Sequence, residues 1–172
     1  MYNQAVTLRP GHARGCGFFP MNAFSEFRKL AERLNAERVP YALVGGVALA
    51  FYTTPRFTRD IDILIAPGEL PKVSDILKRE GYFESSAPWT FMSTQLTLHR
   101  FLKVQDGEDM IVDVLEGGSA RHAQIVDNAL AARSEEGQAV RVAGKEDLIW
   151  MKQSRNSKQD QADIERLRDE EG

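Results

Sequence analysis

Short apolar runs, each closed by glycine, proline or a charged residue, alternate along this chain with segments of helical period. Apolar side chains recur at three- and four-residue spacing over 24–34, which predicts a helix that follows Asn22 as N-cap and ends before Pro40. The run at 41–46 predicts a short buried strand that ends in two glycines. A helical turn or two should follow over 47–52.

The remaining pattern predicts further strands and helices in mixed order. They are a strand over 60–65 after a loop at Pro55, a surface helix over 68–81, a hairpin of strands over 95–104 and 110–117 joined at 106–109, a helix over 120–133, a strand over 138–144, and helices over 145–155 and 161–170. This order predicts an α+β or mixed α/β fold, with one mixed sheet flanked by helices and with helices at the C-terminus.

The length of 172 residues predicts one domain with a real core. Residues 1–20 contain glycines and prolines without a period, and we expect a loose tail there. The folded domain is then expected over 21–172, with its C-terminal helical part at about 145–172.

Composition narrows the class of protein. The hydrophobic fraction of 42% and the charged fraction of 27% are those of a globular protein, and the net charge of -3 gives no overall basic field for nucleic acid. Cys16 is the only cysteine, which excludes an internal disulfide and a cysteine-based zinc site. No apolar run reaches the roughly 18 residues that span a bilayer. We therefore expect a cytoplasmic protein without membrane contact.

Two aspartates stand inside the predicted strand at 60–65. Side chains alternate along a strand, so Asp60 and Asp62 should share one face, about 6.5–7 Å apart along the chain, while the isoleucines take the other face. Two ionised carboxylates in that position repel each other and lose solvation. A divalent cation between them removes this cost, and Mg²⁺ (or Mn²⁺) suits carboxylates that act together with substrate phosphates.

A third carboxylate, Asp113, lies between valines on the returning strand of the hairpin. If that strand lies beside 60–65, the three carboxylates meet on one face and could hold two metal ions. Gly45 and Gly46 stand between a strand and a helix, where backbone N–H groups can approach a phosphate closely. The two features together predict a site for a nucleoside triphosphate.

The stretch "VGGVALAFYTTPRFTRDIDILI" followed by "IVDVLE" resembles the signature of the nucleotidyltransferase superfamily. With Arg56 and Thr58 ahead of the aspartates, it resembles the abortive-infection type found as toxins of toxin–antitoxin pairs. The C-terminal "DLIWMKQSRNSKQDQADIERL" is similar to the tail of that type, although Gln159 separates Lys158 from Asp160. The resemblance covers about 24–167.

The resemblance implies transfer of a nucleoside monophosphate from an NTP to an acceptor hydroxyl of tRNA or protein, with a cognate antitoxin as a further partner. Asp60 and Asp62 would hold the metal ion on the triphosphate. Asp60 and Asp113 would hold a second ion. The implied phosphate-binding residues are Gly45, Gly46, Arg56, Thr58 and Lys152, and the implied acceptor-binding residues are Arg155 and Lys158.

Other interpretations stay open at this point. Asp113 could simply face solvent, and Lys152 could belong to a solvated helix face. A haloacid-dehalogenase-like phosphatase does not fit, because "RFTR" precedes the aspartates and Leu64 follows. Glycosyltransferases with paired aspartates usually need a longer chain. The same fold could also serve as a catalytically silent binding or regulatory module.

Overall fold

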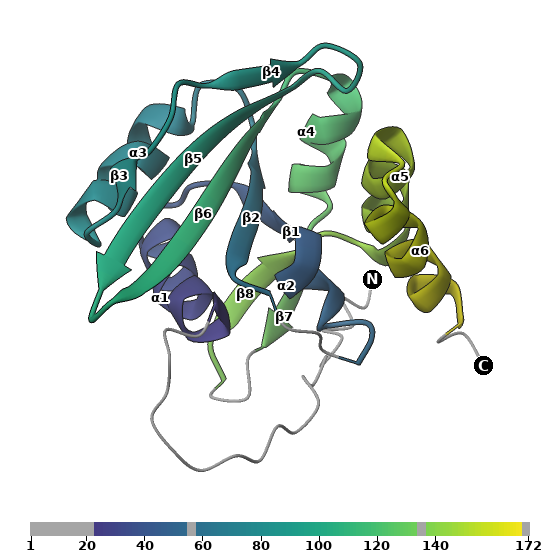
Figure 1. Ribbon diagram of the computed structural model, residues 1–172, viewed down its shortest axis with the longest axis horizontal. Coiled ribbons are helices and arrows are strands. Elements are labelled where there is room, and N and C mark those ends of the chain that lie inside the picture. The colour runs from purple at the N-terminus through teal and green to yellow at the C-terminus, as the bar shows by residue number, and fades with distance from the viewer. Residues whose placement is uncertain (1–22, 55–57, 134–136, 170–172) are drawn as a thin grey trace.

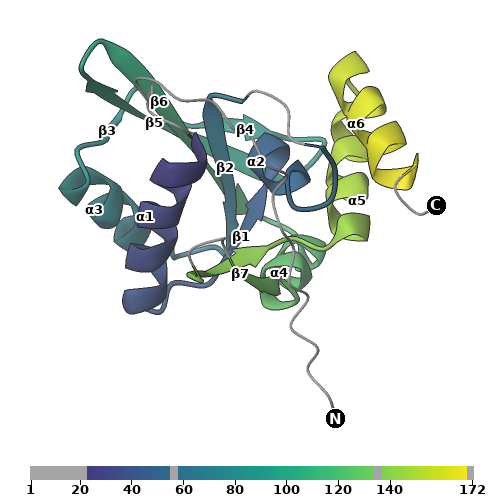
Figure 2. The same ribbon diagram turned by 90° about the horizontal axis from the view of Figure 1, so that it is seen from below.

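The computed structural model describes residues 23–54, 58–133 and 137–169. These residues form one mixed sheet with helices packed around it (Figure 1). Helices α1 (Ala23–Ala36) and α3 (Leu70–Arg79) lie together on one side of the sheet. Seen at right angles, the short α2 (Gly45–Leu49) lies on the opposite side (Figure 2). The expected tail at 1–20 and Arg56 lie outside the described residues.

The sheet has eight strands in the order β3-β5-β6-β2-β1-β8-β7, and β4 also pairs with β5. The pairs β2–β6 and β1–β8 are parallel, and the other pairs are antiparallel, which confirms the expected mixed sheet. The strands are β1 (Tyr41–Val44), β2 (Asp60–Ile65), β3 (Phe83–Glu84), β4 (Trp89–Phe91), β5 (Leu96–Gln105), β6 (Glu108–Gly117), β7 (Leu130–Arg133) and β8 (Ala139–Val142).

Alternation along β2 decides which face carries the core. Ile61, Ile63 and Ile65 are fully buried on one face of the strand. Asp60 and Asp62, which alternate with the isoleucines, are partly exposed on the other face. Phe27 of α1 packs edge-on against Tyr41 of β1, with ring centroids 6.4 Å apart. Helix α1 thus covers the isoleucine face of β2, and the aspartates lie on the opposite face, part of which, at Leu64, also belongs to the core.

The helix expected over 120–133 is wrong in its second half. Helix α4 extends only over Ala120–Asp127. Ser119 is its N-cap, with a hydroxyl that accepts a hydrogen bond from the His122 N–H, and Asn128 is its C-cap. Residues Leu130–Arg133 instead form β7, which pairs with β8 at the sheet edge. Tertiary pairing therefore overrides the helical propensity of the alanines here. The short strands β3 and β4 were also absent from the predicted elements.

Helices α5 (Lys145–Arg155) and α6 (Lys158–Asp169) pack on each other beside the sheet (Figures 1 and 2). Between them Asn156 adopts the left-handed conformation, φ 51°, which ends α5 and lets the chain turn. Helix α6 begins three residues earlier than the pattern predicted. Among the described residues, no helix combines the length and apolar character needed to cross a bilayer.

Candidate active site

The turn from β1 into α2 is shaped around Asp62. Val44 pairs directly with Asp62 in the sheet, and the next residue, Gly45, has φ +69°. A Cβ at Gly45 would lie 2.0 Å from Asp62 Oδ2, a distance that no side chain could tolerate. Glycine is therefore required here for two reasons, the left-handed backbone and the close approach of the carboxylate. Gly46 follows as a partly buried residue of α2.

The three predicted carboxylates meet on one face of the sheet. Strand β2 runs parallel to β6 in a register that places Asp62 opposite Asp113, and Asp60 lies one step along the same face. The expectation that these two strands lie side by side in the sheet is thus confirmed. Asp113 is only 6% exposed, so the interpretation that it faces solvent is wrong.

Crowding of these carboxylates disfavours their ionised forms. Burial, the largest cause, and the charges of Asp113 and Asp60 raise the pKa of Asp62 from 3.8 to about 7, against the opposing effect of Arg155 and Lys152. Burial and Asp113 also raise the pKa of Asp60. A cation bound at Asp60 and Asp62 would offset this repulsion and favour their ionised forms.

Arg100 is a site residue that the sequence reasoning missed. It lies opposite Asp113 on the neighbouring strand β5, and its guanidinium donates from Nε to Asp113 Oδ1 at 2.8 Å and from Nη2 to Oδ2 at 2.7 Å. This bidentate hydrogen bonding, above all, raises the pKa of Arg100. The signal was available, because the hairpin turn at Asp106–Gly107 fixes which residue of β5 faces Asp113.

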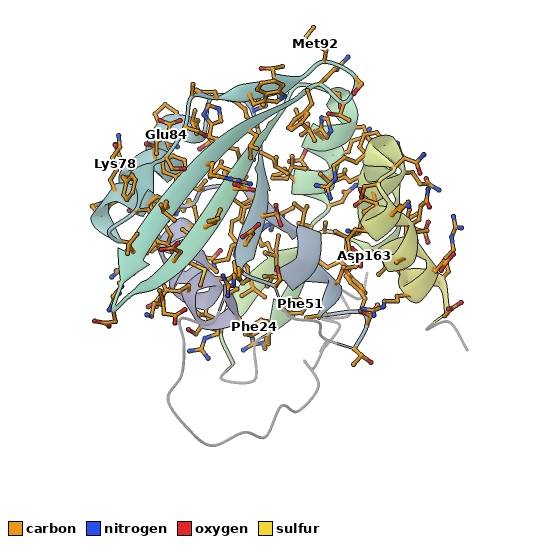
Figure 3. All side chains as sticks on the ribbon, in the orientation of Figure 1. Phe24, Phe51, Lys78, Glu84, Met92 and Asp163 are labelled. Atoms are coloured by element: carbon orange, nitrogen blue, oxygen red, sulfur yellow. The ribbon has the colours of Figure 1, made fainter. Side chains whose placement is uncertain are left out.

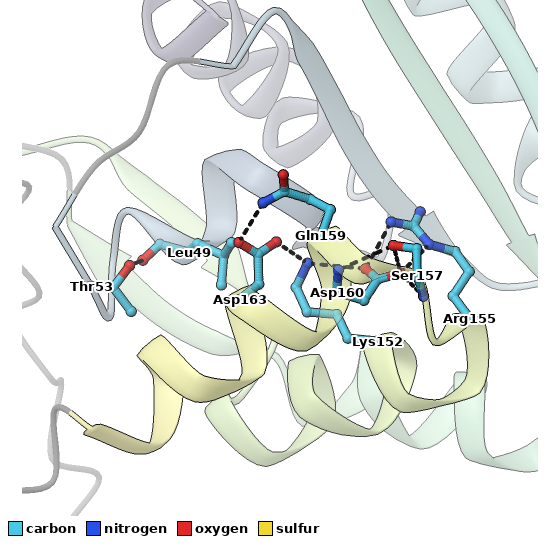
Figure 4. A network of polar contacts seen from close by, with 8 residues as sticks. All are labelled: Leu49, Thr53, Lys152, Arg155, Ser157, Gln159, Asp160 and Asp163. Carbon is cyan, nitrogen blue, oxygen red and sulfur yellow. Dashed lines mark hydrogen bonds and ion pairs between the residues drawn. The ribbon is translucent and has the colours of Figure 1, made fainter.

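The C-terminal helices meet at a buried ion-pair network (Figure 4). Lys152 of α5 is buried and donates to Asp163 Oδ2 at 2.8 Å, with Asp160 Oδ1 at 3.6 Å. Arg155 and Ser157 both donate to Asp160. Burial alone would raise the pKa of Asp160, but these hydrogen bonds outweigh it and lower the pKa to about 2. The solvated-face interpretation of Lys152 is therefore wrong.

A cavity of about 430 Å³ joins the carboxylates to helix α5. Of the predicted site residues, Gly45, Asp62, Asp113, Lys152 and Arg155 line it. Among the other candidates that the structure describes, Gly46, Thr58, Asp60 and Lys158 are not lining residues. Thr58 donates from its hydroxyl to the Asp60 carbonyl oxygen, and Lys158 is exposed at the start of α6. Figure 3 shows Asp163, the partner of Lys152, on the C-terminal helices beside the sheet.

The donor set fits a divalent cation at Asp60 and Asp62. These carboxylates share a face, carry raised pKa values, and lie beside a turn that a Cβ would obstruct. Asp113 is less available, because both of its oxygens already accept hydrogen bonds from Arg100. Accordingly, the described residues contain no ready cluster of three His, Cys, Asp or Glu ligands.

Comparison with known proteins defines the class. The sequence model of a family described as uncharacterised nucleotidyltransferases matches residues 19–159. The chain belongs to that family, and it is a nucleotidyltransferase, as its carboxylate and glycine motifs predicted. No curated protein matches the sequence.

Solved structures share the fold at low sequence identity. The antibiotic-resistance factor ANT(2'')-Ia, crystallised with adenylyl-2''-tobramycin, superposes with a TM-score of 0.53 at 14% identity, covering 86% of this chain and 88% of its own. A putative nucleotidyltransferase from Thermotoga maritima gives 0.53 at 18% identity, covering 77% and 84%. These likenesses confirm the nucleotidyltransferase-like fold.

Proposed function

We propose that this protein transfers a nucleoside monophosphate from an NTP to an acceptor hydroxyl and releases pyrophosphate. The observation that carries the proposal is the set of Asp60, Asp62 and Asp113 on one sheet face, directly beside the turn at Gly45. Carboxylates in this position repel one another unless a cation joins them. A glycine turn in the same place leaves room for the phosphates that such a cation would accompany.

Each residue of the site would have its own role in this reaction. Asp60 and Asp62 would hold Mg²⁺ or Mn²⁺, which when bound would neutralise charge on the triphosphate. The backbone at Gly45 and Gly46 would approach the phosphates. Asp113 would accept the proton of the acceptor hydroxyl. Lys152 and Arg155, which line the same cavity, would add positive charge, and Arg56 and Thr58 precede the metal-binding strand.

A second metal ion would have to share Asp113 with Arg100. The sequence pattern predicts that Asp60 and Asp113 hold this ion. Both oxygens of Asp113 accept from the Arg100 guanidinium, so a second cation would compete with an existing positive charge. We therefore propose that the first ion binds at Asp60 and Asp62, and that a second ion binds only when Arg100 gives up its contact.

A role as the toxin of a toxin–antitoxin pair rests on the resemblance of the C-terminal motif. In that role the acceptor would be a tRNA or a protein, Arg155 and Lys158 would contact it, and an antitoxin would be a partner. Expression of the wild-type chain should then arrest bacterial growth, whereas the Asp62→Asn variant should not. Equal growth of the strains that express the wild type and Asp62→Asn would contradict the toxin role, but it would not contradict nucleotidyl transfer.

Binding of the metal and the nucleotide can be tested by thermal unfolding. Millimolar Mg²⁺ with one of the four NTPs should raise the melting temperature, because a ligand that binds only the folded state stabilises it. Asp62→Asn should lose this increase, and the exposed Asp109→Asn should keep it. An unchanged melting temperature of the wild type with every NTP would count against the site.

A further inference from the structure

The cavity has one charged end and one apolar end. Polar side chains also line the cavity, namely Ser93, Thr94, His122 and Ser154. Beyond the carboxylates, however, most of the lining is apolar and comes from strands β4 to β6 and helix α5. We call this part the apolar wall, and it consists of Phe91, Leu96, Leu98, Leu115, Leu148 and Met151. Most of these side chains remain partly exposed, and Phe91 is 39% exposed, so the wall is open to a ligand.

Strand register orders the wall with respect to Asp113. Arg100 faces Asp113, Leu98 faces Leu115 one step further along the same face, and Leu96 faces Gly117 after another step. Each step of two residues along a strand covers about 6.5–7 Å. The apolar wall thus begins about 7 Å from the carboxylate of Asp113 and continues for about the same length again.

The direction of the proposed reaction assigns this end of the cavity to the acceptor. The attacking and leaving oxygens of a phosphoryl transfer lie roughly in line. Gly45, on the β1 side of Asp62, is the proposed binding place of the leaving pyrophosphate. Asp113 lies on the other side of Asp62, on β6, and the wall continues from it. The wall runs along β5 and β6, across the line from Gly45 to Asp113, so an acceptor whose hydroxyl reaches Asp113 can lay its body on the wall.

The charges of the lining restrict the acceptor further. The acidic residues that line the cavity are Asp62 and Asp113, both at the reaction end. The wall itself offers no carboxylate to an ammonium group. The cations Arg100, Lys152 and Arg155 contact aspartates at the carboxylate end of the cavity, so the wall itself presents no positive charge to an RNA backbone.

We propose that the acceptor is a small hydroxyl compound with an uncharged, apolar body that lies on the apolar wall while its hydroxyl reaches Asp113. The proposal rests on the proposed function for the role of Asp113, but it assigns a binding preference that can be measured without turnover. The cavity of about 430 Å³ is shared between the triphosphate end and the wall, so the part along the wall suits only a small molecule.

Two alcohols of the same chain length test the preference. Phenylhexanol ends in an apolar ring and aminohexanol ends in an ammonium group, and their binding can be measured by saturation-transfer NMR. The measurement is made with Mg²⁺ and a non-hydrolysable NTP analogue present. The wild-type protein should bind phenylhexanol at least about tenfold more tightly, because only the ring gains from burial against the wall.

Two variants place a charge inside and outside the wall. Leu98→Asp should weaken phenylhexanol binding and strengthen aminohexanol binding by about tenfold each. Val104→Asp adds the same charge to the same strand at a position that is 58% exposed and outside the cavity lining, and it should leave both affinities unchanged.

Three results would overturn the proposal. They are equal or tighter binding of aminohexanol by the wild type, weaker binding of phenylhexanol with the NTP analogue than without it, and displacement of phenylhexanol by tRNA. The second would assign the wall to the nucleobase, and the third to an RNA acceptor. Absence of pyrophosphate release with any NTP would count against the proposed function, but it would leave the measured ranking of the two alcohols intact.

Discussion

At the scale of single residues, the site is defined by contacts that leave almost no freedom to substitute. Gly45 approaches Asp62 more closely than any side chain would permit, and Asp113 is held by both arms of Arg100. The aspartates and glycines could be predicted from sequence, because a charged pair inside an isoleucine strand is conspicuous. Arg100 could be found only through the strand register that the hairpin turn sets, since an arginine on a half-exposed strand is by itself common.

Substitution of Gly45 should lower the free energy of unfolding by more than the strain of its left-handed backbone alone would. Gly45→Ala brings a Cβ to 2.0 Å from Asp62 Oδ2, whereas Gly68→Ala, at φ +89°, meets no atom within 4 Å. Both variants strain a left-handed backbone, at roughly 1–2 kcal/mol. The overpacking should cost Gly45→Ala about 1–3 kcal/mol more in free energy of unfolding. Urea denaturation of both variants measures this difference, and equal losses would contradict the close approach.

Asp62 should make metal-free stability depend on pH. Its pKa is raised from 3.8 to about 7 in the folded protein, so between these values the folded state binds a proton that the unfolded state lacks. This contribution is fully present below about pH 4, is lost as pH rises towards about 7, and is constant above. Relative to Asp62→Asn, the wild type should therefore become less stable across this window.

Urea titrations of the two proteins at several pH values in EDTA test this dependence. The variant Asp109→Asn, at an exposed position of β6, serves as the control and should follow the wild type. A stability difference between wild type and Asp62→Asn that stays constant from pH 4 to pH 7 would show that Asp62 keeps an ordinary pKa.

Removal of the Arg100 guanidinium should open Asp113 to a metal ion. In Arg100→Met both oxygens of Asp113 lose their donors, and a nearby positive charge disappears. We expect a second Mn²⁺ to bind about tenfold more tightly to this variant than to the wild type, with an NTP analogue present. Electron paramagnetic resonance titration measures the bound ions. Identical titrations for both proteins would mean that Arg100 does not compete with a metal.

At the scale of elements, the sheet order brings the site together from strands far apart in sequence. Strand β6 joins β2 in parallel, which places Asp113 beside Asp62, and the hairpin carries β5 alongside. The hairpin was predictable from its turn at 106–109, because the chain reverses over a few residues. The change from α4 to β7 was not, since β7 depends on pairing with β8 rather than on its own sequence.

The packing of α5 against α6 should depend on the buried ion pair between Lys152 and Asp163. Asp163 of α6 accepts from Lys152 of α5, and both side chains are buried. Asp163→Asn leaves the Lys152 charge with only Asp160, at 3.6 Å. Loss of one member of a buried pair costs about 3–5 kcal/mol, and we expect the lower part of this range because Asp160 remains.

The matched control for this network is Asp169→Asn, an exposed position at the end of the same helix. Its free energy of unfolding should change by less than about 0.5 kcal/mol. The helices carry Lys152 and Arg155 to the cavity, so Asp163→Asn should also weaken binding of the NTP and metal. If Asp163→Asn is as stable as the control, the network does not hold the two helices together.

At the scale of the whole molecule, a single mixed sheet separates structural and chemical roles between its faces. Helices α1 and α3 lie on one side of the sheet and α2 lies on the other (Figures 1 and 2). The isoleucines of β2 are buried, and its aspartates share the opposite face, beside the turn at Gly45. Helix α5 closes the cavity from the side. This arrangement gives a nucleotidyltransferase an ordered path from the glycine turn, past the aspartates, to an apolar wall.

The proposed transfer of a nucleotide depends on these aspartates. The direct measurement uses each of the four NTPs labelled at the α-phosphate, with Mg²⁺ and a bacterial cell extract that is afterwards separated into small molecules, RNA and protein. Under this proposal the wild type should move label from one NTP into an acceptor fraction, Asp109→Asn should do the same, and Asp62→Asn should not. Equal labelling by wild type and Asp62→Asn in every fraction would contradict it.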